Sequence, residues 1–454
     1  MSAPMVPFYP MTHDDAVEMN TRLAEIRNQL TPADRQGVIY GFHIDSGESD
    51  PKAAVSYIAD AVGFVPAFMN FSAGKFSYGS WKDAFFMPRP CMLKYDGTVD
   101  YYLDPEDYSK KEDGTASDVA DGTYGGNAMM EWGQGGKKIW YAIVPDAGDN
   151  TSASVYIADH QVDERFHAWS FINGAGNYVD HFYTPCYFGT LVNDGTNDVL
   201  RSLSGKSGAN RCKNKTAAQE RAAAKYNNPT GVDIWDTEVY ADCVLINLLL
   251  VLMGKSLNTQ AVFGEGLHTS GSDAVNDSFT SGQHDAKGLF YGTNSGAAGT
   301  YTNAVKVFGM ENYWGFMWRR MAGLVNVSGT AKYKMTRGRQ DGSAADDYVV
   351  STTGSDYAGY LGAGSVPSSS GAYVGQMQFD GNQMVPKTAG GTSMDASHYY
   401  CDGLWTNNGQ TDYALRGGDS SNAAQVGAFY LALNNAASSA NWDSGAAPSC
   451  KPLS

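Results

Sequence analysis

Residues 399–445 constrain the fold more than any other part of this chain. Glycines and aliphatic residues recur there between Tyr, Trp, Ser and Asn, as in the run GAFYLALNN at 427–435. That run has the two-residue period of a β-strand with one buried face. The strand is expected to turn Phe429, Leu431 and Leu433 inward, and Tyr430, Ala432 and Asn434 outward. The glycines at 417 and 418 permit a turn or bulge that a residue with a side chain makes only at a cost.

The composition of this stretch is typical of a recognition surface. Tyr and Trp give a large contact area with few torsions to immobilise, and Ser, Gly and Asn give adaptable hydrogen bonds. An active site would instead need titratable groups with shifted pKa values. We therefore expect a rigid scaffold that presents exchangeable side chains to a ligand.

The whole chain has 454 residues, of which 18% are charged and 52 are Gly. This length favours about two or three domains, and many glycines with few charges favour short strands and ordered loops. The formal net charge of −16 argues against nucleic acid and anionic membrane surfaces as partners. A neutral or cationic partner is favoured instead.

Six cysteines occur without a C-x-x-C pair or a spacing typical of metal sites. We expect buried free thiols, because a chain of this size does not need disulfides. A bridge between Cys401 and Cys450 stays open as an alternative. The chain starts without the features of a signal peptide, and the apolar run Val244–Met253 is too short to span a bilayer. Synthesis in the cytosol without membrane insertion is expected.

Residues 1–36 are expected to contain a helix at 14–30. Met19, Leu23, Ile26 and Leu30 follow the four-three-four spacing of a coiled-coil seam. Fewer than three heptads are present, so two alternatives stay open. The helix lies on its own domain, or it forms a short oligomerisation stem.

Residues 37–195 are predicted to form a β-rich domain. Strand-like runs occur near 38–44, 84–92, 128–132, 138–144 and 154–158, with turns of Gly, Asp and Asn between them. Asp50-Pro51 is expected to open a helix that Gly63 closes.

Residues 196–454 form the second predicted domain. Thr216 and Gln219 make a capping box ahead of an Ala-rich helix. A longer helix, ending at Gly254, carries an apolar stripe that should pack on a sheet. The Gly-, Ser- and Asp-rich residues 338–395 are expected to be mostly loop.

The sequence lacks the common signatures of catalysis. It has no complete phosphate loop, no His followed by Glu as in the helical zinc motif, and no G-x-S-x-G elbow. Pairs among Glu131, Glu164, Glu238, Glu265 and Glu311 could in principle hydrolyse a glycoside. Lone carboxylates more often accept backbone amide bonds. We therefore expect no enzyme, no catalytic residue, no cofactor and no metal site.

Three segments, 235–266, 307–324 and 415–445, together resemble the C-type lectin-like fold in its formylglycine-generating-enzyme-like branch. The second contains Gly315 and Trp318, and the third begins near Arg416-Gly417-Gly418. Their order and spacing are most similar to phage tail proteins and to variable proteins that retroelements diversify. The resemblance implies an α+β fold, in which a short N-terminal helix and a β-rich N-terminal domain precede a C-type lectin-like domain at 196–454. It also implies that the domain at 37–195 attaches to the virion or serves as a scaffold. The variable segment would span about 395–450.

The resemblance also implies which residues vary. Mutagenic copying in such systems alters adenines, so Asn codons are typical targets, and the tail retains Asn407, Asn408, Asn422, Asn434, Asn435 and Asn441. The implied ligand-binding set is Tyr399, Tyr400, Asp402, Thr406, Asn407, Asn408, Asp412, Asp419, Ser420, Ser421, Tyr430, Asp443 and Ser444. The implied scaffold set is Gly315, Trp318, Trp405, Arg416, Gly417, Gly418 and Trp442.

A receptor-binding protein of a phage virion is the function that the resemblance implies. Its partners would be a host cell-surface protein or glycan and other virion tail proteins, and it would assemble as a homotrimer. Two alternatives from other classes are a structural tail, baseplate or decoration protein without diversification, and an enzyme, either a glycan hydrolase or an oxidase of the sulfatase-modifying kind. The closely spaced Cys pair of those oxidases and the calcium signatures of sugar-binding lectins are missing from this sequence.

Overall fold

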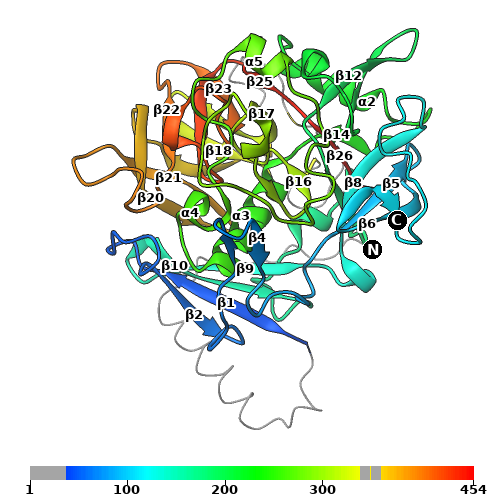
Figure 1. Ribbon diagram of the computed structural model, residues 1–454. Coiled ribbons are helices and arrows are strands. Elements are labelled where there is room, and N and C mark those ends of the chain that lie inside the picture. The colour runs from blue at the N-terminus through cyan, green and yellow to red at the C-terminus, as the bar shows by residue number, and fades with distance from the viewer. Residues whose placement is uncertain (1–36, 338–347, 349–358, 454) are drawn as a thin grey trace.

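A computed structural model of the chain describes residues 37–337, 348 and 359–453. The expected helix at 14–30 lies outside the described residues. Strands make up 37% of the structure and helices 12%, so the molecule is mostly β. The expectation of an α+β fold with a lectin-like C-terminal domain is therefore wrong. Large sheets pack around one long helix, α3, instead (Figure 1).

The first sheet is four-stranded and antiparallel. Its strands, in spatial order, are β2 (Val55–Ala59), β1 (Ile39–Ile44), β10 (Asp149–Ala158) and β9 (Trp140–Asp146). One face enters the main core through Phe42, Ile143 and Val155. The short ladder of β3 (Phe68–Asn70) and β4 (Lys75–Ser77) follows β2.

The predicted helix after Asp50-Pro51 is wrong. The Asp50 carboxylate accepts the N–H groups of Lys52 and Ala53, both at 2.8 Å. These bonds close a local turn, and the chain then enters β2. A turn-forming Asp and a helix N-cap use the same side-chain bonds, so the sequence pattern does not separate them.

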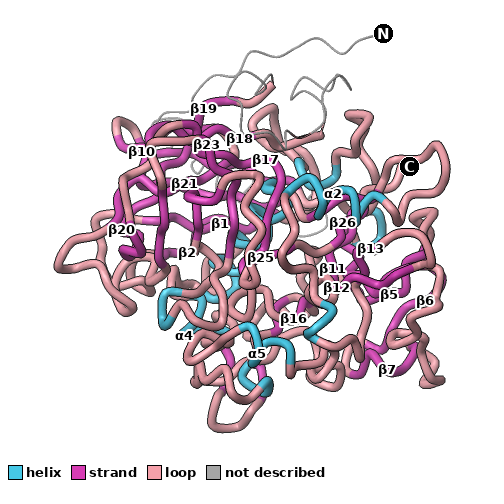
Figure 2. The backbone as a smooth tube through the Cα atoms, turned by 90° about the horizontal axis from the view of Figure 1, so that it is seen from above, coloured by secondary structure: helices cyan, strands magenta, loops and turns pink. Residues whose placement is uncertain are grey.

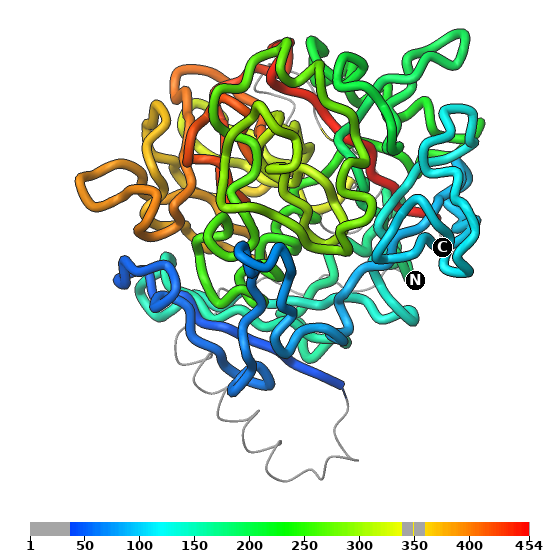
Figure 3. The backbone as a smooth tube through the Cα atoms, in the orientation of Figure 1, coloured from blue at the N-terminus to red at the C-terminus, as the bar shows by residue number. Residues whose placement is uncertain are grey.

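The second sheet joins strands from both ends of the described chain. Its strands, in spatial order, are β14 (Trp235–Thr237), β26 (Pro448–Cys450), β11 (Phe182–Pro185), β8 (Gly126–Trp132), β5 (Arg89–Lys94), β6 (Val99–Asp104) and β7 (Asp107–Lys111). Figure 3 shows the red C-terminal run crossing to the cyan strands. The sheet thus continues across the predicted domain boundary near residue 195, and the largest apolar cluster contains residues from both sides of it.

The third sheet has nine strands and is nearly closed. Its strands, in spatial order, are β19 (Leu361–Ser365), β18 (Thr330–Tyr333), β17 (Trp318–Val327), β23 (Thr411–Arg416), β24 (Leu431–Asn435), β22 (Gly403–Thr406), β20 (Ser370–Asp380) and β21 (Gln383–Ala389), and β25 (Ser444–Gly445) also pairs with β17. The Gln378 amide donates to Ser365 O at 2.8 Å and links β20 to β19. Strands β19, β20 and β21 cover most of residues 361–389, so the expectation of a loop there is wrong.

Among the described residues the helices are few and mostly short, as the view from above shows (Figure 2). They are α2 (Ala217–Lys225), α3 (Tyr240–Gly254), α4 (Thr259–Phe263) and α5 (Asp273–Asp277), with 3-10 turns η1 (Gln134–Gly136), η2 (Trp169–Phe171), η3 (Gly208–Asn210), η4 (Tyr301–Asn303) and η5 (Ala423–Gln425). Two further ladders are β12 (Thr190–Asn193) with β13 (Asp198–Arg201), and β15 (Lys306–Val307) with β16 (Met310–Glu311). The capping box of Thr216 and Gln219 is confirmed. Every residue of α3 is buried, not only a stripe, so this helix lies inside the core.

A buried ion triad fixes the third sheet to the start of α3. Glu238 precedes α3 and binds two arginines, Arg416 through Oε1 and Arg319 through Oε2 at 3.3 Å. All three side chains are at most 6% exposed. Burial alone would raise the pKa of Glu238, but the two guanidinium groups outweigh burial and lower it.

Removing the charge of Glu238 should destabilise the protein strongly, because two buried guanidinium groups would lose their counter-ion. We expect Glu238→Gln to lower the free energy of unfolding by about 3–5 kcal/mol, measured by denaturant titration. The matched control is Glu112→Gln, which breaks the exposed Arg89–Glu112 pair and should cost at most about 1 kcal/mol. Equal losses in the two variants would contradict the role given to the triad.

Candidate binding surface

The structure divides the implied ligand-binding set into two groups. The buried group is Tyr400, Asp402, Asp412, Asp419, Ser420, Tyr430 and Ser444. The group with exposed or partly exposed side chains is Tyr399, Thr406, Asn407, Asn408, Ser421 and Asp443. Residues of the first group do not reach an external ligand, so their assignment to the ligand-binding set is wrong.

The buried group lies inside because the strands of this region are covered on both faces. β24 pairs with β22 and β23 and is a middle strand of the nearly closed sheet. The expected outward positions Tyr430 and Ala432 are 0% and 2% exposed. Alternation along one strand cannot reveal that a second layer covers its other face.

The buried carboxylates of this region serve internal bonds. Asp402 accepts the N–H of Phe429 at 2.7 Å, and its carboxylate occupies the space where a Cβ on Gly427 would lie. Asp412 accepts the amide of Gln410 at 2.5 Å. Burial raises the pKa of Asp402 well above its ordinary value and that of Asp412 to about 6.

The asparagines of the same region behave differently. All six of them, Asn407, Asn408, Asn422, Asn434, Asn435 and Asn441, keep exposed or partly exposed side chains. Elsewhere the chain buries many asparagines, namely Asn127, Asn173, Asn227, Asn247, Asn276, Asn312, Asn326 and Asn382. Asparagine is therefore not confined to the surface of this protein, yet every asparagine of residues 399–445 lies there.

Four of these asparagines form a row, which we call the asparagine row: Asn407, Asn434, Asn435 and Asn441. Asn407 N–H donates to Leu433 O at 3.1 Å, which places Asn407 beside β24. The Asn435 amide donates to Asn434 Oδ1 at 2.9 Å, and the Asn441 amide to Asn435 Oδ1 at 3.4 Å. Beneath the row, buried Asn326 donates to Asn407 O and Leu433 O at 3.2 and 3.1 Å. The backbone that carries the row is therefore held from inside.

A group of three aromatic side chains borders the asparagine row. Trp405 on β22 is partly exposed and donates Nε1–H to the Tyr430 hydroxyl at 2.7 Å. The Tyr430 ring lies 4.5 Å from that of Trp318. Gly418 makes room for the Tyr430 ring, because a Cβ there would lie 2.7 Å from it. Its φ of +78° also favours glycine, as the sequence predicted for this turn.

The remaining scaffold residues lie as follows. Arg416 is buried in the ion triad, and Gly417 and Gly315 both have positive φ, at +85° and +72°. Trp442 is partly exposed. Trp405 and Trp442 thus border the surface rather than the core.

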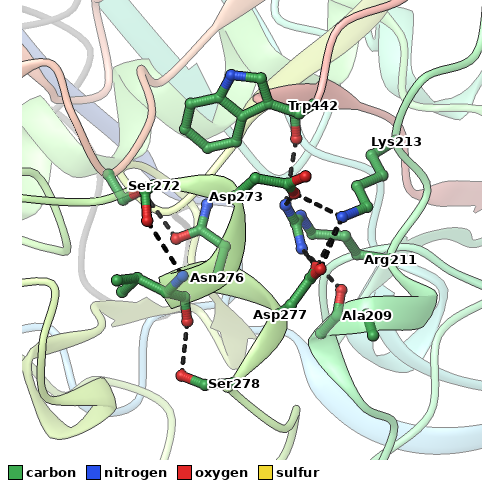
Figure 4. A network of polar contacts seen from close by, with 12 residues as sticks. Ala209, Arg211, Lys213, Ser272, Asp273, Asn276, Asp277, Ser278 and Trp442 are labelled. Atoms are coloured by element: carbon green, nitrogen blue, oxygen red, sulfur yellow. Dashed lines mark hydrogen bonds and ion pairs between the residues drawn. The ribbon is translucent and has the colours of Figure 1, made fainter.

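A cluster around Arg211 holds the loop of Trp442 (Figure 4). The Arg211 guanidinium is fully buried and pairs with Asp277 and with Asp273, the latter at 2.5 Å. It also donates to Trp442 O at 3.3 Å. Lys213 pairs with Asp277 at 2.8 Å. No local pattern of residues predicts this cluster, because its members are up to 231 positions apart.

A pair of acidic residues lies under the exposed Ser421. Asp419 accepts the N–H and the hydroxyl of Ser421, both at 2.6 Å. Burial raises the pKa of Asp419 to about 6, although the Ser421 bonds lower it, and nearby Asp443 raises it further. Burial also raises the pKa of Asp443.

Four of the five glutamates that might pair for hydrolysis bind protein groups: Glu238 belongs to the ion triad, and Glu131, Glu265 and Glu311 have the partners that follow, whereas Glu164 is exposed. Glu131 accepts the hydroxyls of Tyr102 and Tyr183, each at 3.0 Å. Glu311 is fully buried and accepts the N–H groups of Gly282 and His284. Glu265 lies 3.2 Å from His268.

The next two findings, on metal binding and on membrane-spanning helices, apply to residues 37–337, 348 and 359–453. No cluster of three His, Cys, Asp or Glu residues has the geometry to hold a metal ion there. Nor does this part of the chain contain a helix with the length and apolarity needed to cross a bilayer. All six cysteines are buried and free, so the expectation of free thiols is confirmed.

Comparison with protein-family models and with curated proteins finds no match for the chain.

The raised pKa of Asp419 predicts a pH-dependent stability. Its folded pKa of about 6 lies above the ordinary value of 3.8, so the folded state holds this proton more tightly than the unfolded state. The resulting penalty is absent below about pH 4, grows as pH rises from about 4 to about 6, and stays constant above about pH 7. We expect Asp419→Asn to gain about 1–3 kcal/mol over wild type between about pH 4 and pH 7, measured by urea unfolding at each pH.

The control for this prediction is Asp113→Asn, in which an exposed carboxylate with a lowered pKa is removed. That variant should show no such gain with rising pH. A pH-independent difference between wild type and Asp419→Asn would contradict the prediction.

Proposed function

We propose that this chain is a non-enzymatic receptor-binding protein of a phage virion, which binds a host cell-surface protein or glycan. The binding surface is the asparagine row together with Trp405 and Trp442. The row consists of positions that a retroelement diversifies. The observation that carries this proposal is that every asparagine of residues 399–445 is at the surface, whereas asparagines elsewhere are often buried.

The chemistry of the surface suits this role. Each Asn amide offers both donors and an acceptor, so it adapts to different polar partners. Trp405 and Trp442 add flat aromatic area with few torsions to immobilise. Exchange of the row residues would leave the interior unchanged, because their outer side chains make only the few bonds described above.

The support beneath the surface also suits this role. Asn326 and the Arg211 cluster hold the two loops that carry the row and Trp442. A pre-organised backbone reduces the ordering cost of binding. Weak individual contacts would gain strength through multiplicity, and we therefore propose a homotrimer repeated on the virion beside other tail proteins.

Sequence variation at the 3′ end of the gene distinguishes this proposal from the alternative of a structural tail protein without diversification. We expect sequences of the 3′ end of this gene, taken from a population of virions, to vary at the asparagine row, Asn408 and Asn422. Asp402, Asp412, Asp419 and Tyr430 should stay constant, because they are buried. An adenine-differing copy of the segment beside the gene is also expected. Uniform sequences without such a copy would favour a tail component that is not diversified.

Binding itself can be measured with purified protein and whole host cells as the probe. We expect Asn407→Ala, Asn441→Ala and Trp405→Ala each to weaken adsorption about fivefold or more, equivalent to about 1 kcal/mol per contact. The control is Asn150→Ala, which changes an exposed asparagine on β10 outside the surface. Adsorption that is unchanged in all of these variants would overturn the proposed surface.

A further inference from the structure

An open surface pocket of about 370 Å³ lies beside the second sheet. Its lining residues are Lys94, Tyr95, Asp96, Tyr124, Gly125 and Pro229. They belong to the end of β5 and the turn before β6, to the approach to β8, and to the loop after α2. The volume lies in the range of about 300–1,000 Å³ that small-molecule sites have. In Figures 1 and 2, β5 and β6 lie on the opposite side of the molecule from β22 and β23, so the pocket is remote from the asparagine row.

The main chain of both pocket tyrosines is held from inside. Tyr95 O accepts the Nε1–H of buried Trp235 at 2.8 Å, and Tyr95 N–H donates to Gly125 O at 3.1 Å. The Arg201 side chain, whose residue is 3% exposed, donates to Tyr124 O at 2.7 Å and lies 5.3 Å from the centre of the Tyr95 ring. Two walls of the pocket are therefore fixed before a ligand arrives, which reduces the ordering cost of binding.

Asp100 positions two of the lining side chains. Its Oδ1 lies 2.7 Å from Lys94 Nζ, and its Oδ2 accepts the Tyr124 hydroxyl at 3.2 Å. One carboxylate thus holds an ammonium group and an aromatic ring at the same pocket. The ammonium group has three donors, so its pairing with Asp100 leaves donors for a ligand.

The turn after β5 also supplies an acceptor. Asp96 Oδ1 accepts the N–H and the hydroxyl of Thr98, at 2.9 and 2.6 Å. These bonds lower the pKa of Asp96, so its carboxylate is ionised at neutral pH. Among the described residues, no group donates to Asp96 Oδ2, and none bonds to the hydroxyl of the partly exposed Tyr95. Both oxygens are available to a ligand.

The chemistry of the pocket matches a neutral sugar. A sugar ring has a face of C–H groups, which packs on an aromatic ring, and a rim of hydroxyls, which donate to a carboxylate and accept from an ammonium group. Asp96 and Asp100 disfavour a phosphate or carboxylate ligand, and Lys94 disfavours a cation. A neutral ligand with many hydroxyls satisfies all of these groups.

We propose that the pocket between Tyr95 and Tyr124 binds a neutral saccharide, either a mono- or disaccharide or the end of a longer glycan. It is a second binding site, separate from the asparagine row. This inference does not depend on the receptor-binding role, because its residues lie outside the segment at 399–445.

Binding can be measured by saturation-transfer NMR with the full-length protein. The probes are glucose, galactose, mannose and N-acetylglucosamine, with acetate and choline as charged probes. We expect at least one sugar to bind in the millimolar range, as is usual for a small, open site, and the charged probes to show no transfer. Absence of transfer to every sugar, or transfer to acetate or choline alone, would overturn the proposal.

Substitutions in the pocket locate the sugar that binds. We expect Tyr95→Ala and Tyr124→Ala each to weaken its affinity about tenfold. Asp96→Asn should weaken it about fivefold, because the amide can keep the Thr98 bonds but replaces the acceptor Oδ2 with a donor. This last variant lies on an exposed turn and leaves the interior unchanged. Unchanged affinity in all three variants would overturn the proposal.

Two controls separate this site from the rest of the molecule. Tyr178→Ala removes a tyrosine that is 46% exposed and lies outside the pocket, and it should leave the sugar affinity unchanged. Asn407→Ala should also leave it unchanged. A loss of sugar binding in Asn407→Ala, with wild-type affinity in Tyr95→Ala, would assign the sugar to the asparagine row and overturn the pocket.

Discussion

The contact between Glu238 and the two arginines governs the organisation of this molecule. Glu238 belongs to the short connection between β14 and α3, Arg319 to β17, and Arg416 to β23. One carboxylate thus fixes the second sheet, the central helix and the third sheet relative to one another. Arg416 also donates to Tyr313 O at 2.8 Å and lies 4.0 Å from that ring, so the guanidinium has partners on several sides. The two terminal nitrogens of Arg416 are bonded, to Tyr313 O and to Glu238, while its Nε is buried without a protein partner, and pairing with the carboxylate offsets much of the cost of burying the charge.

The backbone of the proposed binding surface is also held by buried polar side chains. The asparagine row is carried by strand ends and turns whose backbone bonds to buried Asn326, and Trp442 is carried by a loop that bonds to buried Arg211. In both places an interior polar side chain satisfies main-chain carbonyls. The exposed side chains above make few internal bonds. The protein therefore separates the groups that determine its shape from the groups that solvent or a ligand can reach.

Local sequence patterns predicted some of these features correctly and failed to predict others. The capping box of Thr216, the helix ending at Gly254 and the positive-φ turn at Gly418 depend on a few neighbouring residues, so their patterns predict them. The burial of Asp402 and Tyr430 depends on a second layer supplied by distant strands, which alternation does not encode. Asp50 illustrates a third case, because a turn and a helix start share the same side-chain bonds. Arg211 was missed because its partners are distant in sequence.

The placement of β26 determines when the fold can be completed on the ribosome. β11, at 182–185, receives its second neighbour only when residues 448–450 have been made. At typical translation speeds that delay is roughly 15–50 s. During this interval the edge of β11 has no strand partner, and an open strand edge invites pairing with other chains. The second sheet is therefore completed late, because the partner of this edge comes from the last residues of the described chain.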